Sequence, residues 1–212
     1  MDIATTGSQI AQDVQNGAEQ RAAPRFGLLI RAAKLACESG QFVCVIRDVS
    51  ETGVSARLFH ALPDDEHYEL HMPGGAIYEI TCVWRREQEA GFRFVAPVEV
   101  ESLINEACAY PKRGLRLAVE FPVTLTTLTQ RCTAMVQNIS QQGALIKCDG
   151  LFAIEQTLRI EAPDIAPELK EIRAKVRWRR GTDYGVALDD TFSLGDFARF
   201  GAFLQAPALL AG

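Results

Sequence analysis

The chain has 212 residues, 48% hydrophobic and 23% charged, with a net charge of −5. This composition is typical of a folded globular protein, and its acidic balance argues against a protein that coats nucleic acid polymers or an anionic membrane, since such binding needs many cationic contacts with phosphate. The sequence has neither an apolar run of membrane-spanning length nor the basic flank and apolar stretch of a secretory signal. We therefore expect a cytoplasmic protein without membrane insertion.

Residues 1–19 are small and polar, and we expect a disordered leader. The following segments 27–37, 41–50 and 53–60 carry short apolar runs broken by Gly, Ser and Asp, which favours antiparallel strands. Residues 28–37 also allow a helix. We prefer a strand because the counterpart in the second half, 117–128, contains Pro122 and many β-branched residues.

The rest of the first half predicts more strands and a short helix. Residues 68–86 indicate a strand, a Pro-Gly-Gly turn and a longer strand, and 87–97 indicate a turn and another strand. In 98–110 the apolar positions have helical spacing.

The second half repeats this order, with strand-like segments at 117–128, 131–140, 143–150, 157–163, 171–180 and 184–190 and an amphipathic helix at 191–205. Two landmarks repeat at a separation of 94 residues: Trp84 matches Trp178, and Gly91 matches Gly185. We predict a mainly β protein of two tandem six-stranded antiparallel barrels, each with a C-terminal helix, in domains 20–109 and 110–212.

A short polar motif also repeats. The stretch RDVSETGVSARL contains Asp48, Ser50 and Gly53, and QNISQQGALIKC contains Asn138, Ser140 and Gly143 at the same spacing. A turn alone would explain each copy, with Asp and Ser bonding nearby backbone and Gly supplying a positive φ.

Two arginines precede the first copy. Arg21 and Arg25 are four residues apart, and Pro24 favours an extended or turning segment over a helix. A guanidinium binds phosphate or the O6/N7 edge of guanine bidentately, and Asp48 is suited to accept the N–H groups of guanine's Watson–Crick edge. Ser50 adds a donor and an acceptor. Together these groups meet the requirements of a guanine nucleotide.

RxxxR followed by a strand and then (D/N)xSxxG resembles the signature of PilZ domains, receptors for cyclic di-GMP that fold as six-stranded barrels with a C-terminal helix. The resemblance covers residues 20–109 and 110–206. It implies that Arg21 and Arg25 contact the ligand's phosphates and guanine edges, and that Asp48, Ser50 and Gly53 form the part of the site on the barrel surface.

The second copy departs from this pattern. Lys112 stands where the first arginine belongs, Arg116 aligns with the second, and Arg113 is an alternative to Lys112 if the loop shifts by one residue. Lysine keeps the charge but lacks the planar fork. Asn138, Ser140 and Gly143 complete a second ligand site, or else the degenerate copy serves as a dimerisation or partner-docking surface.

Other patterns have simpler interpretations. The three histidines, His60, His67 and His71, lie near acidic residues 64–66, but no further ligand cluster completes a metal site, so we interpret the segment as a solvated hairpin. The arginines after each Trp fit a solvated outer strand face. Six scattered cysteines without a CxxC pair predict buried, reduced thiols. No nucleophile with a base and no phosphate loop is recognisable, so we expect neither an enzyme nor a cofactor.

We therefore hypothesise a receptor in which the Arg21–Arg25 segment orders over cyclic di-GMP and an effector protein detects the change. A second copy of the chain, in a homodimer, is a further candidate partner. The alternative is a ligand-independent assembly module. We expect the short linker to bring the barrels into contact, with Lys112 to Arg116 at the interface. Residues 1–109 carry 9 basic and 16 acidic residues, against 13 and 11 in 110–212, so the second half is better suited to an acidic partner.

Overall fold

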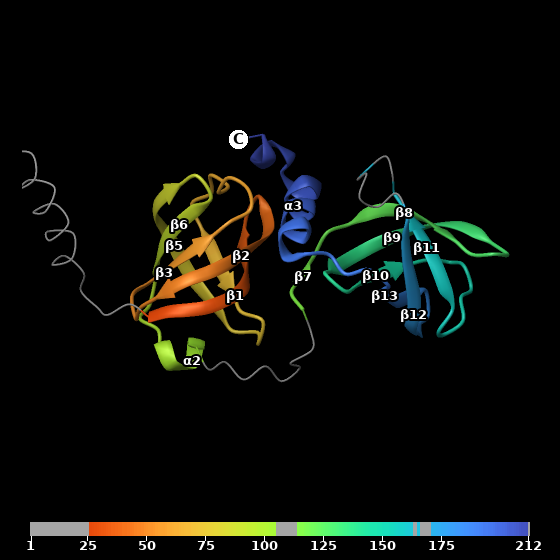
Figure 1. Cartoon of the computed structure of the whole chain (residues 1–212), viewed down its shortest axis with the longest axis horizontal. Coiled ribbons are helices and arrows are strands. Elements are labelled where there is room, and N and C mark those ends of the chain that lie inside the picture. Colours follow the sequence, from red (N-terminus) through yellow and green to blue (C-terminus); the bar gives the residue numbers. More distant parts are fainter. Residues whose placement is uncertain (1–25, 105–113, 163–164, 166–170, 212) are drawn as a thin grey trace, which may run out of the picture.

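The structure is a computed structural model that describes residues 26–104, 114–162, 165 and 171–211; in 26–30 and 104 it describes the backbone alone. Its strands form two barrels, and one helix, α3, lies between them (Figure 1). No helix in these residues has the length and apolar character of a membrane span.

The first barrel contains six antiparallel strands and is closed, in the order β1-β2-β3-β6-β5-β4. The strands confirm the expectation for this half, including the strand reading of 27–37. Their bounds are Phe26–Cys37 (β1), Gly40–Val49 (β2), Gly53–Arg57 (β3), Tyr68–His71 (β4), Ile77–Arg86 (β5) and Glu89–Phe94 (β6).

The second barrel has the order β10-β13-β12-β11-β8-β9-β7, and a β9–β10 pairing closes six of these strands into a ring. The bounds are Arg116–Leu117 (β7), Phe121–Thr126 (β8), Arg131–Ser140 (β9), Gly143–Lys147 (β10), Thr157–Glu161 (β11), Ile172–Arg180 (β12) and Asp183–Leu188 (β13). The single strand expected at 117–128 is therefore two strands, because residues 118–120 leave the ladder between Leu117, opposite Ile139, and Phe121, opposite Val136.

The expectation of a C-terminal helix on each barrel is correct only for the second. Helix α3, Leu194–Gln205, is capped by the Ser193 hydroxyl, which accepts from the Asp196 N–H at 3.1 Å, and is followed by the 3-10 turn η2, Pro207–Leu210. In the first barrel α2 covers Val100–Ile104, and residues 105–110 of the predicted helix lie outside the described part. Of the two α-helices in the described residues, α3 is therefore the one with a substantial buried face.

The repeated Trp and Gly are a packing pair in both barrels. Trp84 lies opposite Gly91, and Trp178 lies opposite Gly185, each after a register shift in its strand. A Cβ at either glycine would lie 2.0 Å from the indole Nε1, so the ring occupies the space where a side chain would stand. This pair accounts for the repeat as a structural feature.

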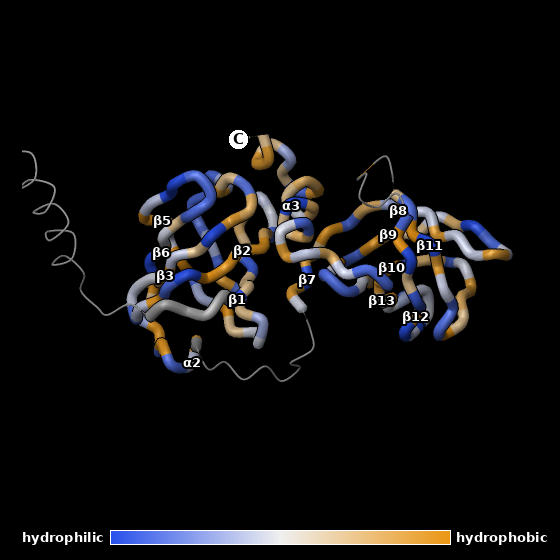
Figure 2. The backbone as a smooth tube through the Cα atoms, viewed as in Figure 1, coloured by the Kyte–Doolittle hydropathy of each residue, from blue (hydrophilic) through white to orange (hydrophobic). Residues whose placement is uncertain are grey.

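Strand β2 is the part of the first barrel that packs against the second barrel. Residues 42–46 are buried without interruption, which is the pattern of a strand covered on both faces. Val43 belongs to the same apolar cluster as Phe197 and Phe200 of α3. Figure 2 shows hydrophobic residues along β2 and α3 where the barrels meet. The second barrel's helix therefore provides the cover for the outer face of β2.

Hydrogen bonds fix this contact. The Gln205 carboxamide accepts from the Gln41 N–H at 2.8 Å and donates to the Gln41 carbonyl at 2.8 Å, as a neighbouring strand would. The Ala118 N–H donates to the Gln41 Oε1 at 3.0 Å. Gly40 has φ +140°, and a Cβ there would lie 2.6 Å from the Gln205 Oε1, so this position requires glycine.

The expected contact between barrels is thus present, but it involves α3, β2 and Ala118. Arg116 is exposed and bonds within its own barrel, whereas Lys112 and Arg113 lie outside the described residues.

Candidate functional site

The turn between β2 and β3 is held by Ser50. The Ser50 N–H donates to the Gly53 carbonyl at 2.8 Å, and the Ser50 hydroxyl accepts from the Gly53 N–H at 3.2 Å and donates to the Gly53 carbonyl at 3.3 Å. Ser50 is 4% exposed. In this structure its hydroxyl therefore serves the turn, as the turn interpretation of the motif expects.

The last residue of β6 in the first barrel, and of β13 in the second, holds this turn in the same way. The Thr52 carbonyl accepts from the Phe94 N–H at 3.0 Å, and the Gln142 carbonyl accepts from the Leu188 N–H at 2.9 Å. Ser140 repeats the role of Ser50, since its hydroxyl donates to the Gly143 carbonyl at 3.0 Å. The two motifs are thus equivalent in backbone structure.

The motif glycines are required by close packing. A Cβ at Gly53 would lie 2.9 Å from the Phe92 carbonyl oxygen, and one at Gly143 would lie 2.4 Å from the Val186 carbonyl oxygen. Neither is among the described positive-φ glycines, so the expectation that Gly53 supplies a positive φ is wrong. Glycine is present because the neighbouring strand passes too close for a side chain.

Asp48 begins a polar row on the outer face of the first barrel. It lies opposite Ser55, whose hydroxyl donates to the Asp48 Oδ2; Ser55 lies opposite Gly91, and Gly91 lies opposite Trp84. Asp48 is half-buried and Ser55 is 7% exposed. A carboxylate, a hydroxyl and an indole that covers Gly91 therefore line four neighbouring strands, and a planar ligand with N–H donors fits this set of groups.

The second barrel has a less polar version of this row. Asn138 lies opposite Leu145, Leu145 opposite Gly185, and Gly185 opposite Trp178. An amide replaces the carboxylate and an apolar side chain replaces the hydroxyl. The row keeps its shape and loses its negative charge.

Arg93 is a site candidate that the sequence analysis missed. It lies on β6 opposite Gly53, two residues after Gly91 and therefore on the same face of the strand. Its side chain is exposed and makes no hydrogen bond or ion pair with another described residue. Ala187 takes the equivalent position opposite Gly143. The signal available in sequence was the contrast between GFRF and GVAL after the two landmark glycines.

Arg116 shows where the second arginine of the motif lies in the second barrel. It is opposite Ser140 in the β7–β9 ladder, and its guanidinium donates to the Asn138 Oδ1 at 2.9 Å. Its counterpart in the first barrel, Arg25, lies outside the described residues, as do Arg21, Lys112 and Arg113. The described register begins one residue later, where Phe26 lies opposite Val49 just as Leu117 lies opposite Ile139.

The histidine interpretation is wrong for His60. His60 is 3% exposed, its ring packs on Phe42 at 5.0 Å between centroids, and burial lowers its pKa. His71 instead pairs with Glu69 at 2.7 Å near the surface. Among the described residues no three His, Cys, Asp or Glu side chains group as a metal site.

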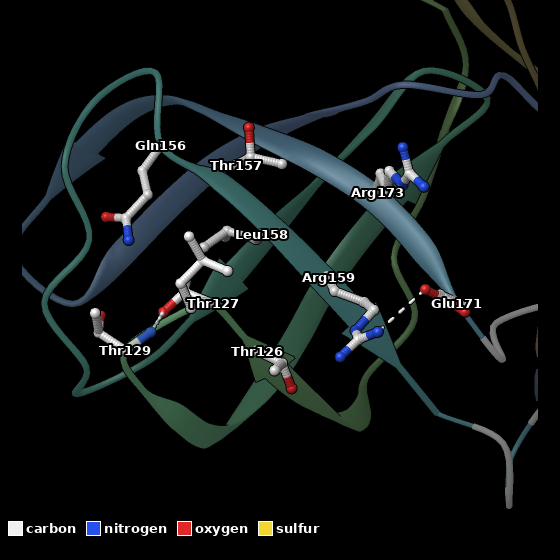
Figure 3. A pocket seen from close by; sticks show the side chains of 10 residues that line it. Thr126, Thr127, Thr129, Gln156, Thr157, Leu158, Arg159, Glu171 and Arg173 are labelled. Carbon is white, nitrogen blue, oxygen red and sulfur yellow. Dashed lines mark hydrogen bonds and ion pairs between the residues drawn. The ribbon is translucent and has the colours of Figure 1, made fainter.

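A pocket of about 660 Å³ lies elsewhere, on the second barrel between the β8–β9 turn and strands β11 and β12. Figure 3 shows it lined by threonines, Leu158 and two arginines, of which Arg159 is bonded to Glu171 at 3.1 Å. No motif residue lines it. The site suggested by the motifs is therefore a strand surface at the β2–β3 turn and is separate from this pocket.

The fold and the repeated turn define a tandem protein of two closed six-stranded barrels, each with the same polar motif at one corner. The PilZ domain family model matches residues 19–109 and again 112–206. The chain therefore belongs to the PilZ domain family, with two copies of the domain.

Similarity to solved structures is distant. PlzA of Borreliella burgdorferi in complex with c-di-GMP has 11% identity and a TM-score of 0.32, covering 92% of this chain and 99% of that chain. MotI/DgrA, the inhibitor of motility of Bacillus subtilis, has 13% and 0.36, covering 86% and 99%. The K. pneumonia MrkH complex with c-di-GMP has 9% and 0.30, covering 97% and 94%. No curated protein matches this chain.

Proposed function

We propose that this chain is a cytoplasmic, non-enzymatic receptor that binds cyclic di-GMP through its first barrel. The observation that carries the proposal is the outward row of Asp48 and Ser55, beside the exposed Arg93. The carboxylate matches the N–H donors of a guanine edge, and the arginine matches its phosphate or Hoogsteen edge. The second barrel has Asn138, Leu145 and Ala187 at these positions.

Arg21 and Arg25 complete this proposed site. The sequence places Arg25 one residue before β1, whose first pair sets Phe26 against Val49, next to both Asp48 and Ser50. A guanidinium there is within side-chain reach of a ligand seated on the row. Binding then adds bidentate contacts that exist only with the dinucleotide present, which is what a ligand needs in order to shift a conformational equilibrium.

We further propose that β2 transmits the change to the second barrel, and through it to a partner protein. Asp48 lies near one end of this strand and Gln41 near the other, roughly 23 Å away at strand spacing. Gln41 is bound by Gln205 of α3 through both backbone groups. A shift of β2 at the ligand end therefore acts directly on the helix that joins the barrels.

Calorimetric titration of the full chain with cyclic di-GMP tests the binding proposal, with GTP and cyclic di-AMP as ligand controls. We expect saturable binding at one class of site and a loss of about 100-fold or more in Arg25→Ala, because bidentate charged contacts are the strong ones. Arg116→Ala, the same change at the matched position of the second barrel, is expected to leave affinity within a factor of about two, since its barrel is not used.

Two results would contradict this proposal. An absence of heat at millimolar dinucleotide would favour the assembly module, for which changes to apolar surface rather than to arginine should matter. A loss confined to Arg116→Ala would move the site to the second barrel. Far-UV circular dichroism of each variant separates lost binding from lost fold.

A further inference from the structure

Two cysteines of the second barrel have their sulfur atoms in contact. The Sγ of Cys132, the second residue of β9, lies 3.3 Å from the Sγ of Cys148, the first residue after β10. Both are free thiols. A disulfide needs about 2.05 Å between sulfurs, so a closure of roughly 1.3 Å separates the two states.

The barrel fixes both cysteines through their backbones. Cys132 lies opposite Leu125 in the β8–β9 ladder, while the Cys148 N–H donates to the Thr182 carbonyl at 2.9 Å. Because the β8–β9 ladder holds Cys132 and the β12–β13 turn holds Cys148, the sulfurs meet without any rearrangement of the fold. The contact is a property of the strand register.

The segment after Cys148 folds closely over the pair. The Gly150 N–H donates to the Cys148 Sγ at 3.2 Å, and a Cβ at Gly150 would lie 3.0 Å from the Cys132 Sγ and 3.3 Å from the Cys148 Sγ. The Gly150 carbonyl accepts from the Tyr184 hydroxyl at 2.7 Å. The thiols therefore share a small enclosed space, with Cys148 4% exposed and Cys132 partly accessible from outside.

The other described cysteines have no such neighbour. The Cys37 Sγ donates to the Gly40 carbonyl at 3.7 Å, and the Cys82 Sγ donates to the Trp84 carbonyl at 3.6 Å. Cys44 is fully buried in the first core. Within the described residues, Cys132 and Cys148 form the sulfur pair.

We propose that Cys132 and Cys148 are a reversible oxidation site that forms an intramolecular disulfide. With a peroxide as oxidant, the Cys132 sulfur takes one peroxide oxygen to become a sulfenic acid, and water leaves. The Cys148 thiol then attacks that sulfur, the S–S bond forms, and a second water leaves. The two thiols lose two electrons and two protons in total, and the peroxide is reduced.

The bond would join the start of β9 to the segment that follows β10, at the end of the second barrel away from α3 (Figure 1). It closes a loop between residues 16 positions apart and so restricts the unfolded chain. The oxidised protein should therefore unfold at a higher temperature than the reduced protein, and dithiothreitol should reverse the shift.

The test uses the full chain and diamide, which takes two electrons and two protons from a pair of thiols. After oxidation at pH 8, unfolding in guanidinium and alkylation with N-ethylmaleimide, we expect four alkylated cysteines instead of six. Trypsin cuts after Arg131 and Lys147, so the bond joins the peptides 132–147 and 148–159. The chain should remain monomeric on a non-reducing gel.

Cys132→Ser and Cys148→Ser should each abolish the joined peptides, whereas the matched control Cys82→Ser should retain them. Circular dichroism verifies that each variant is folded. Six alkylated cysteines after diamide treatment of the wild type, a bond to a different cysteine, or disulfides formed only between chains would each overturn the proposal.

Discussion

The two barrels share a scaffold and differ at its outer surface. Both have the Ser-to-Gly turn, the backbone bond to that turn from the end of β6 or β13, and the Trp–Gly pair, and these shared features are accounted for by packing. The differences are concentrated beside the turn, where Asp48, Ser55 and Arg93 correspond to Asn138, Leu145 and Ala187. The comparison distinguishes residues that stabilise the barrel from candidate ligand-binding residues. A residue that only stabilises the barrel has no reason to differ between the two copies.

A second difference concerns burial of the strand that leads into the motif. In β2 residues 42–46 are buried on both faces, because α3 covers the outer one. Its counterpart β9 alternates, and Met135 on its outer face is 39% exposed. The first barrel therefore has the more polar motif, and it is also the barrel whose motif strand, β2, packs against a helix of the other barrel.

The largest expected effect is on the shared scaffold, at the motif glycines. Gly143→Ala should lower the free energy of unfolding by about 3 kcal/mol and Gly53→Ala by about 1.5 kcal/mol, because the added Cβ meets a carbonyl oxygen at 2.4 Å and 2.9 Å respectively. Urea unfolding measures both. Gly114→Ala, where a Cβ meets nothing within 4 Å, is the matched control. Equal stability of Gly143→Ala and Gly114→Ala would refute the close approach of β13.

The next effect tests the contact between barrels. Gln205→Ala removes both bonds to the Gln41 backbone and should cost about 2 kcal/mol, since two partly buried backbone groups lose their partners. Small-angle scattering should show a more variable separation of the barrels. Gln142→Ala, an exposed side chain without a hydrogen bond to a described residue, should leave both measurements unchanged. If the two variants behave alike, the β2–α3 contact does not fix the barrels.

The smallest effect distinguishes the two outer surfaces. Arg93→Ala should weaken binding of cyclic di-GMP about 10-fold, because a single charged contact is lost while the rest of the proposed site remains. Arg131→Ala, an exposed arginine of the second barrel, makes the same change in net charge and should have no effect on affinity. Calorimetry of both compares them directly. Equal losses would indicate that overall charge, and not the position of Arg93, decides affinity.

The sequence by itself determined the architecture: the order of strands, the division into two similar halves and the turn at each motif. Period-two apolar patterns, glycine turns and repeated landmarks are local signals, and local chemistry is sufficient to specify them.

Only the tertiary structure decided which residues meet across strands. Ser55 and Arg93 are not part of the RxxxR and (D/N)xSxxG motifs. Ser55 meets Asp48 through the register of the β2–β3 hairpin, and Arg93 meets Gly53 through the ladder between β3 and β6, which are distant in sequence. Gln41 and Gln205 also meet from distant parts of the chain, and Cys132 meets Cys148 through the pairing of the consecutive strands β9 and β10. Register and the docking of α3 set these contacts, because both depend on how the whole chain packs rather than on any one segment.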